Sequence, residues 1–254
     1  MTSPLPQLIP PPPETPARYF RSRVQTVLAM TVIILFAVTF VVQAFRVPTE
    51  SMENTLLVGD YLLADKLHFG EAGRIGWLLP YRNIQRGEII VFHYPVDGSQ
   101  YFVKRVIGIP GDRIHLSNGM VYVNGVPLQE NYATYKTGAA DSYRDDFPAH
   151  LWTSLASASW RSRLPEHISN GELVVPAGNY FVLGDNRERS SDSRYWGFVP
   201  RANVIGRPLV VYLSMRGEQP PLSRGPDDKL FHSGSMFAHL LQSARWKRTF
   251  ILVR

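Results

Sequence analysis

The chain has 254 residues, of which 44% are hydrophobic, enough for one large domain or two small ones with an ordinary core. It contains no cysteine, which excludes disulfide bonds and thiolate metal sites. The formal net charge is +6, but the basic residues are scattered, and no helix-turn-helix, zinc-finger or aromatic RNA-binding signature is present. We therefore expect no nucleic acid partner, and a basic face toward anionic lipid is the simpler account of the charge.

The N-terminal part of the chain consists of a tail and an apolar segment. Residues 1–16 contain seven prolines and one acidic residue, a composition typical of a disordered tail. Arg18, Arg21 and Arg23 follow, and residues 24–45 carry no charge. As a helix this segment would be about 33 Å long, which is enough to span a bilayer. The arginines before the segment predict a cytoplasmic N-terminus and an extracytoplasmic remainder.

The alternative for this segment is a secretory signal peptide that is removed after Val42-Gln43-Ala44, leaving Phe45 as the mature N-terminus. Both the apolar stretch and the tail before it are long for a signal peptide. The sequence therefore favours a permanent anchor.

From residue 46 onward the pattern indicates mostly β structure. Runs of β-branched and aromatic residues are bounded by turn-forming residues. Asn118-Gly119 separates two such runs and is a strong hairpin signal. Residues 133–170 lose this rhythm and are expected to form loops with a short helix. The expected strands are 60–64, 88–92, 101–107, 114–116, 120–123, 172–175, 180–183, 203–205 and 208–212.

A serine and a lysine stand in two short segments that suit a catalytic dyad. Ser51 lies in a Pro-Thr-Glu-Ser-Met segment after the apolar stretch, and Lys104 lies in an apolar strand. A serine nucleophile needs a base within hydrogen-bond reach. Lysine can be that base only when neutral, and burial beside Phe102 and Val106 would lower its pKa. Without further motifs, Ser51 would be a solvated turn residue and Lys104 an edge-strand lysine that reaches solvent.

A Ser-His-Asp triad is poorly supported. The chain has seven histidines, but none stands in a pattern that pairs it with a serine, and Gly-x-Ser-x-Gly is absent. A metal site is also weakly supported, because the aspartates of residues 184–198 have no His or Glu cluster beside them. We therefore expect no metal and no cofactor.

The two segments, together with residues 184–198, resemble the bacterial type I signal peptidase (leader peptidase) family. The resemblance covers most of residues 45–112 and 172–206, and the three motifs in this order behind a membrane anchor are specific. It implies a membrane-anchored serine endopeptidase that cleaves signal peptides from exported preproteins. The chain departs from many members at Asn54, where they have proline, and at Thr49, where they have serine.

The resemblance implies a role for each matching residue. Ser51 would be the nucleophile and Lys104 the base, while the Thr49 hydroxyl and the Ser51 N–H would form the oxyanion hole. Ser190 matches the serine that orients the lysine. Val47 and Val103 match residues that would line pockets for small substrate residues at −1 and −3. Structural ion pairs near the site would be formed by Arg105, Asp185, Asp192 and Arg194. Three further matches are at structural positions: Gly59, Asp60 and Lys66.

The expected fold is mostly β, with a transmembrane helix followed by an antiparallel β-sheet catalytic core and an inserted, smaller β-rich cap. The expected partners are signal-peptide-bearing preproteins and membrane lipid, for a monomer that crosses the plasma or inner membrane once. The expected parts are a disordered cytoplasmic tail at 1–23, a transmembrane helix at 24–45, a catalytic core at 46–111 and 178–232, a cap at 112–177, and a basic amphipathic segment at 233–254.

Several alternatives stay open at this point. Self-cleaving repressors also use a Ser-Lys dyad, but they are soluble and carry a DNA-binding module, which the apolar segment argues against. A membrane-tethered β domain that binds extended peptides without catalysis would need neither Ser51 nor Lys104. Endoplasmic-reticulum relatives have histidine in place of Lys104, so the bacterial type fits better, with mitochondrial and thylakoid relatives as further options. The segment 233–254 is expected either on the membrane surface or packed on the domain.

Overall fold

A computed structural model of the chain describes residues 16–36, 41–67, 82–136, 138–216 and 242–253. The contacts divide the chain into two units, residues 1–41 and residues 42–254. Two of the sequence expectations fall largely outside the described residues: the tail at 1–15 and the first part of the C-terminal segment, 233–241.

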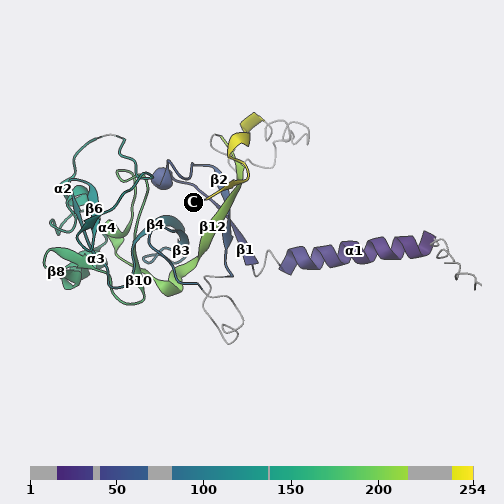
Figure 1. The fold of residues 1–254 in the computed structure, drawn as a ribbon, viewed down its shortest axis with the longest axis horizontal. Helices are drawn as coiled ribbons and strands as arrows, with labels where there is room; N and C mark the ends of the chain where they lie inside the picture. The colour runs from purple at the N-terminus through teal and green to yellow at the C-terminus, as the bar shows by residue number, and fades with distance from the viewer. Residues whose placement is uncertain (1–15, 37–40, 68–81, 137, 217–241, 254) are drawn as a thin grey trace, which may run out of the picture. The chain divides into compact units, whose positions relative to one another are not determined.

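The described part of the first unit is helix α1, Pro16–Phe36, drawn in purple in Figure 1. Proline suits the first position of a helix, where its missing N–H costs no hydrogen bond. Because α1 begins at Pro16, residues 16–23 are helical, and the prediction of a disordered tail is wrong for them. Apolar side chains along α1, such as Val27 and Ile33, are exposed. No helix in the described ranges combines the length and the mean hydropathy that a membrane span requires.

The second unit begins with a strand at residues that the sequence assigned to the helix. Strand β1, Val42–Arg46, pairs antiparallel with β2, Asp60–Asp65, from Val42 opposite Asp65 to Arg46 opposite Tyr61. Its β-branched and aromatic residues suit a pleated surface, and the neighbouring strand supplies the backbone hydrogen bonds. The prediction of a helix through residue 45 is therefore wrong for residues 42–45.

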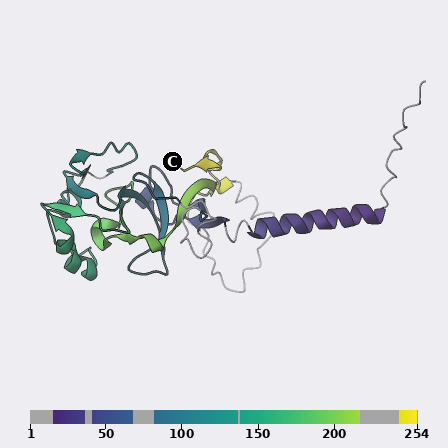
Figure 2. The same ribbon diagram turned by 60° about the horizontal axis from the view of Figure 1, so that its bottom comes forward.

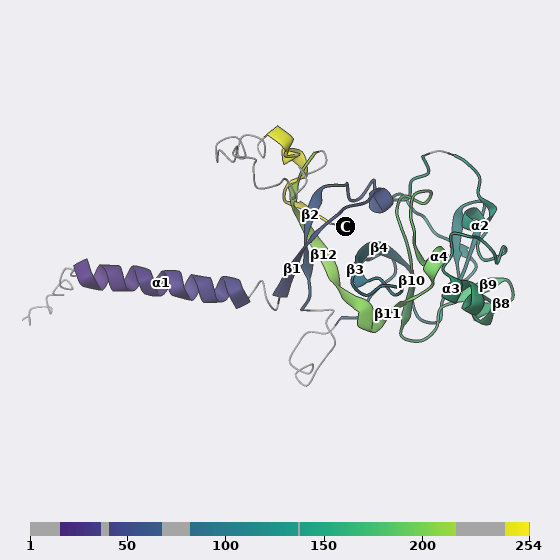
Figure 3. The same ribbon diagram turned by 180° about the vertical axis from the view of Figure 1, so that it is seen from behind.

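The described strands of the second unit form two antiparallel sheets, seen from three sides in Figures 1, 2 and 3. The larger sheet has the order β1-β2-β12-β3-β4-β10-β11, and β13 also pairs with β12. Its remaining strands are β3 Ile89–His93, β4 Tyr101–Gly108, β10 Asn179–Leu183, β11 Val199–Pro200, β12 Val204–Ser214 and β13 Ile251–Leu252.

The smaller sheet has the order β7-β6-β5-β9-β8 and is formed by residues between β4 and β10. Asn118 and Gly119 both adopt positive φ angles, 48° and 79°, in the predicted hairpin turn between β5 and β6. The prediction of a mostly antiparallel β fold is confirmed. The strands of this sheet are β5 Arg113–Ser117, β6 Met120–Val123, β7 Val126–Pro127, β8 Ile168–Ser169 and β9 Glu172–Val174.

Short helices occupy the region from 133 to 170, as the sequence predicted. Ser157 caps one of them by accepting a hydrogen bond from the backbone N–H of Trp160. The helices of the second unit are α2 Ser142–Asp145, α3 Ala158–Arg163 and α4 Ser193–Trp196, with 3-10 turns η2 Glu50–Met52, η3 Leu164–His167, η4 Arg201–Asn203 and η5 Trp246–Arg248.

Strand β4 is packed on both of its faces. Because side chains alternate along a strand, Ile107 joins the core shared with the smaller sheet, which includes Trp160 and Phe181. Val106 joins a second core cluster with Phe92. β4 also pairs with β3 on one side and with β10 on the other. These contacts fix the backbone of the strand that carries Lys104.

Candidate active site

Ser51 lies in the 3-10 turn η2, a few residues after β1. Its neighbour Met52 is buried together with Leu56 in a core cluster, which fixes the turn to the larger sheet. Asn54 adopts a positive φ of 94° directly after the turn. Asparagine tolerates the left-handed region, whereas the ring of proline holds φ near −65°. The turn around Ser51 is therefore one that proline at position 54 could not form.

Lys104 lies in β4 opposite Ile90 and is only 4% exposed. Its Nζ is 2.6 Å from Oγ of Ser51, within hydrogen-bond distance. The Phe102 ring lies on the same side, with its centroid 5.4 Å from Nζ. The fold thus brings together the two residues that the sequence singled out as nucleophile and base.

The environment of Lys104 favours its neutral form. Burial lowers the pKa of its amine from the ordinary value of 10.5 to about 8, because desolvation penalises the ammonium ion. The carboxylates of Asp192 and Asp185 act in the opposite direction, and the Arg194 guanidinium acts with the burial. At pH 8 about half of the molecules would carry a neutral amine next to Ser51.

The backbone of the turn is held by residues 184–187. The Asn186 backbone N–H donates to the Ser51 carbonyl at 3.1 Å, and its side-chain amide donates to the Glu50 carbonyl at 3.3 Å. A Cβ at Gly184 would lie 2.5 Å from the Ser51 carbonyl oxygen, so only glycine allows this close approach. Sequence reasoning did not assign a role to Asn186, although it stands inside the third motif.

Two buried ion pairs flank the site. Arg105 binds Asp185 through Nε at 2.9 Å and Nη2 at 2.8 Å, and Arg194 binds Asp192 through Nε at 2.8 Å and Nη2 at 2.7 Å. Both carboxylates are fully buried. Such two-point contacts are among the strongest ionic interactions in proteins. Asp192 also accepts a hydrogen bond from the Gly184 N–H, which connects this pair to the segment that holds the turn.

The other residues expected from the family lie around Ser51. Thr49 Oγ1 is 3.3 Å from Ser51 Oγ, and Val47 packs in the same core cluster as Val103. Ser190 is buried against Gly184, where an added Cβ would clash with its hydroxyl. No hydrogen bond joins the Ser190 hydroxyl to Lys104 in the described part of the chain, so the expected contact is not formed here.

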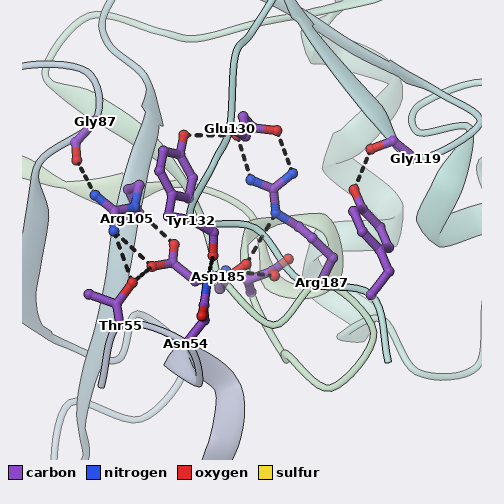
Figure 4. A network of polar contacts seen from close by, with 12 residues as sticks. Asn54, Thr55, Gly87, Arg105, Gly119, Glu130, Tyr132, Asp185 and Arg187 are labelled. Atoms are coloured by element: carbon purple, nitrogen blue, oxygen red, sulfur yellow. Dashed lines mark hydrogen bonds and ion pairs between the residues drawn. The ribbon is translucent and has the colours of Figure 1, made fainter. Parts of the chain in front are cut away.

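A second polar network adjoins the site and was not found from the sequence (Figure 4). Glu130 binds the guanidinium of Arg187 with both carboxylate oxygens and also accepts from the Tyr132 hydroxyl. The Tyr132 ring lies under Arg105, 3.9 Å from its guanidinium carbon, and Thr55 donates to Asp185. No motif marks Glu130, which lies in a chain segment without regular structure.

Other site chemistries find no support in the described residues. Those residues contain no group of three His, Asp or Glu side chains that could hold a metal ion. His93 bonds the Gly98 carbonyl and His115 bonds Glu172, so both are committed away from Ser51. The only base found in hydrogen-bond contact with Ser51 in the described part of the chain is Lys104.

Comparisons with known proteins found one matching family model and several similar proteins. Residues 20–213 match the family model described as signal peptidase, peptidase S26. A signal peptidase I of Pseudomonas fluorescens is 33% identical over 211 residues, 77% of this chain and 72% of the relative. A signal peptidase I of Aquifex aeolicus is 31% identical over 236 residues, which are 80% of this chain and 87% of the relative. A signal peptidase I from Enterococcus faecalis, known from a crystal structure, has 38% sequence identity to this chain. The match covers 50% of this chain and 97% of that protein's chain, with a TM-score of 0.36.

The lowered pKa of Lys104 predicts that this residue destabilises the fold at neutral pH. Below pH 8 the lysine is charged in both states, and its desolvation costs the folded state about 3 kcal/mol. Between pH 8 and 10.5 the unfolded state binds more protons, so the cost disappears as pH rises. Lys104→Met should therefore raise the free energy of unfolding at pH 7 by about 3 kcal/mol in urea titrations, with little difference above pH 10.5. Equal stability of the two proteins at pH 7 would contradict a net cost of burying the charged amine.

Proposed function

The chain belongs to the signal peptidase family, peptidase S26, and we propose that it is a membrane-anchored endopeptidase that removes N-terminal signal peptides from exported preproteins with a Ser51–Lys104 dyad. As a member of this family it is a serine peptidase. The observation that carries the proposal is the 2.6 Å contact between Lys104 Nζ and Ser51 Oγ in a buried site.

The proposed reaction follows serine peptidase chemistry with an amine as the base. Neutral Lys104 takes the proton of the Ser51 hydroxyl as Oγ attacks the scissile carbonyl carbon. The ammonium of Lys104 then gives its proton to the leaving amine, and the C–N bond breaks to leave an acyl-enzyme. Lys104, neutral again, takes a proton from the water that attacks the ester, and returns it to Ser51 Oγ as the C–O bond breaks and the signal peptide is released. The pKa of about 8 suits both directions of this proton transfer.

Thr49 is proposed to donate to the oxyanion together with the Ser51 backbone N–H. Its hydroxyl lies 3.3 Å from Ser51 Oγ, and it makes no side-chain capping bond to the turn. The threonine hydroxyl keeps the donor that serine supplies in many relatives. An oxyanion donor of this kind contributes about 2.7–4 kcal/mol to transition-state stabilisation.

The substrate is proposed to bind as an extended strand. β10 pairs with β4 only from Arg105 to Gly108, so among the described strands residues 101–104 have a partner on the β3 side alone. β1 is an edge strand of the same sheet. Strand addition would present the backbone of a peptide to Ser51, with Val47 and Val103 facing its small side chains at −1 and −3.

The membrane anchor, the topology and the division into parts are also proposals. The uncharged residues that precede strand β1, 24–41, and the arginines before them support a single pass with a cytoplasmic N-terminus. The larger sheet would form the catalytic core, and residues 112–177 the cap.

The proposed anchor and its orientation can be tested on the full chain. We expect the protein to resist alkaline carbonate extraction, and a reporter fused to its C-terminus to be active only outside the cytoplasm. A reporter active in the cytoplasm would overturn the orientation, and a mature N-terminus at Phe45 would support a cleaved signal.

The dyad predicts that Ser51→Ala and Lys104→Ala each abolish preprotein cleavage, with the double variant no worse than either single variant. Residues that act as one unit are not additive. Wild-type kcat/KM should rise with pH through about 8, as the Lys104 amine becomes neutral. Retained cleavage in either single variant would overturn the dyad and point to another base, whereas a wild-type chain that binds extended peptides without cleaving them would support a peptide-binding domain. A rise near pH 6.5 instead would point to a histidine.

The oxyanion assignment predicts a difference between two substitutions of Thr49. Thr49→Val keeps the shape of the side chain and removes the hydroxyl, so kcat should fall roughly 10²–10³-fold with little change in KM. Thr49→Ser keeps the hydroxyl and should retain much of the activity. Single-turnover cleavage of a preprotein gives the rate of the chemical step in each of the two variants. An unchanged rate in Thr49→Val would show that other donors hold the oxyanion.

A further inference from the structure

The end of the chain packs on the larger sheet next to the segment that carries Ser51. Residues 244–253 lie beyond the part that the family model matches, which ends at residue 213. Ala244 forms an antiparallel bridge with Met215, and β13 pairs with β12 through Leu252 opposite Val210. We call residues 244–253 the C-terminal clasp. Its position is thus set by backbone hydrogen bonds at both of its ends.

The segment from Val47 to Asp60, here called the nucleophile loop, is closed at its base. The Val47 N–H donates to the Asp60 carbonyl at 2.8 Å, and the Gly59 N–H donates to the Val47 carbonyl at 2.9 Å. Ser51 lies inside this loop. Anything that holds the base and the second half of the loop therefore also limits the positions open to the Ser51 hydroxyl.

Arg248 of the clasp joins two points of the nucleophile loop. Its Nη2 donates to Asp60 Oδ2 at 2.7 Å and to the Thr55 carbonyl at 2.9 Å. Asp60 is fully buried and also accepts from the Leu57 N–H and the Ser214 hydroxyl. A buried carboxylate needs a cation in contact to offset its desolvation. Arg248 supplies the nearer positive charge, and Arg245 of the clasp adds a second one, with its Nη1 3.8 Å from Asp60 Oδ1. Arg248 at the same time fixes the middle of the loop to its base.

Val253 supplies the apolar half of the same contact. It is only 6% exposed and packs in one cluster with three nucleophile-loop residues, Val47, Met52 and Leu56. Met52 is adjacent to Ser51, and Val47 is the proposed pocket residue. The clasp therefore touches the loop on a polar side through Arg248 and on an apolar side through Val253.

We propose that the C-terminal clasp positions Ser51 for reaction, with Arg248 and Val253 as positioning residues. The proposal rests on the function proposed for Ser51 in the preceding subsection. Neither residue touches the reacting atoms. They act by restricting the nucleophile loop, and a small displacement of a nucleophile is enough to lower a rate by orders of magnitude.

The test compares Arg248→Ala with Lys247→Ala in the full chain. Lys247 is adjacent, carries the same charge and is exposed, so its substitution is a matched control. Arg248→Ala should lower kcat roughly ten- to a hundredfold, with KM nearly unchanged and the pH–rate limb still near 8. Arg248→Lys should recover part of the rate, because it restores the charge beside Asp60. Lys247→Ala should cleave at the wild-type rate.

A second measurement does not depend on activity. Amide hydrogen exchange of residues 47–60 should become faster in Arg248→Ala and in Val253→Ala, while exchange in the β5–β6 hairpin stays unchanged. Leu252→Ala, at a residue that is 62% exposed, is the control for Val253→Ala. Acceleration throughout the second unit would instead show a general loss of stability and overturn a positioning role.

The outcomes separate this inference from the proposed function. Wild-type kcat and unchanged exchange of residues 47–60 in both Arg248→Ala and Val253→Ala would overturn the clasp, while the dyad would stand. A wild-type chain that cleaves no preprotein would contradict the proposed function, and the exchange of residues 47–60 would still decide whether the clasp holds the loop.

Discussion

The site depends on one constraint: an amine must be kept neutral next to a serine hydroxyl. Burial of Lys104 in β4 supplies this, but the aspartates Asp185 and Asp192 nearby would restore its charge. Each of them is bound at two points by an arginine, Arg105 or Arg194. Desolvation is the largest effect on the pKa of Lys104, and the Arg194 guanidinium offsets part of the opposing effect of the two carboxylates. The ion pairs are thus part of the electrostatics of the site as well as of its structure.

The nucleophile loop is held from three directions by segments that are far apart in the sequence. Asn186 binds its backbone at Ser51, the Tyr132 carbonyl accepts a hydrogen bond from Asn54, and Arg248 binds at Thr55. A loop closed only at its base would sample many positions, and each additional contact removes some of them. Catalysis by positioning requires such restriction, because the reacting atoms must approach within a narrow range of distances.

Much of the fold follows from local patterns. The runs of β-branched and aromatic residues predicted β2, β3, β4 and β10 close to their observed bounds, and Asn118-Gly119 predicted the hairpin. The prediction failed at both ends of the apolar segment. Residues 16–23 form the first part of helix α1, although the proline-rich composition before them predicted a disordered tail. Residues 42–45 form part of strand β1 and not the end of a helix. An uninterrupted apolar run is compatible with a helix or a buried strand, and only the presence of β2 as a partner decides between them.

The sequence by itself determined the order of the motifs, and through them the family and the pair Ser51 and Lys104. Those features depend on residue type and spacing, which a chain carries before it folds. Only the tertiary structure decided that Glu130 would bind Arg187 and that Arg248 would bind Asp60 across 188 positions. Contacts of this kind have no local signature, because they arise from strand register and from the path of intervening segments. The restriction of Ser51 is therefore a property of the folded sheet.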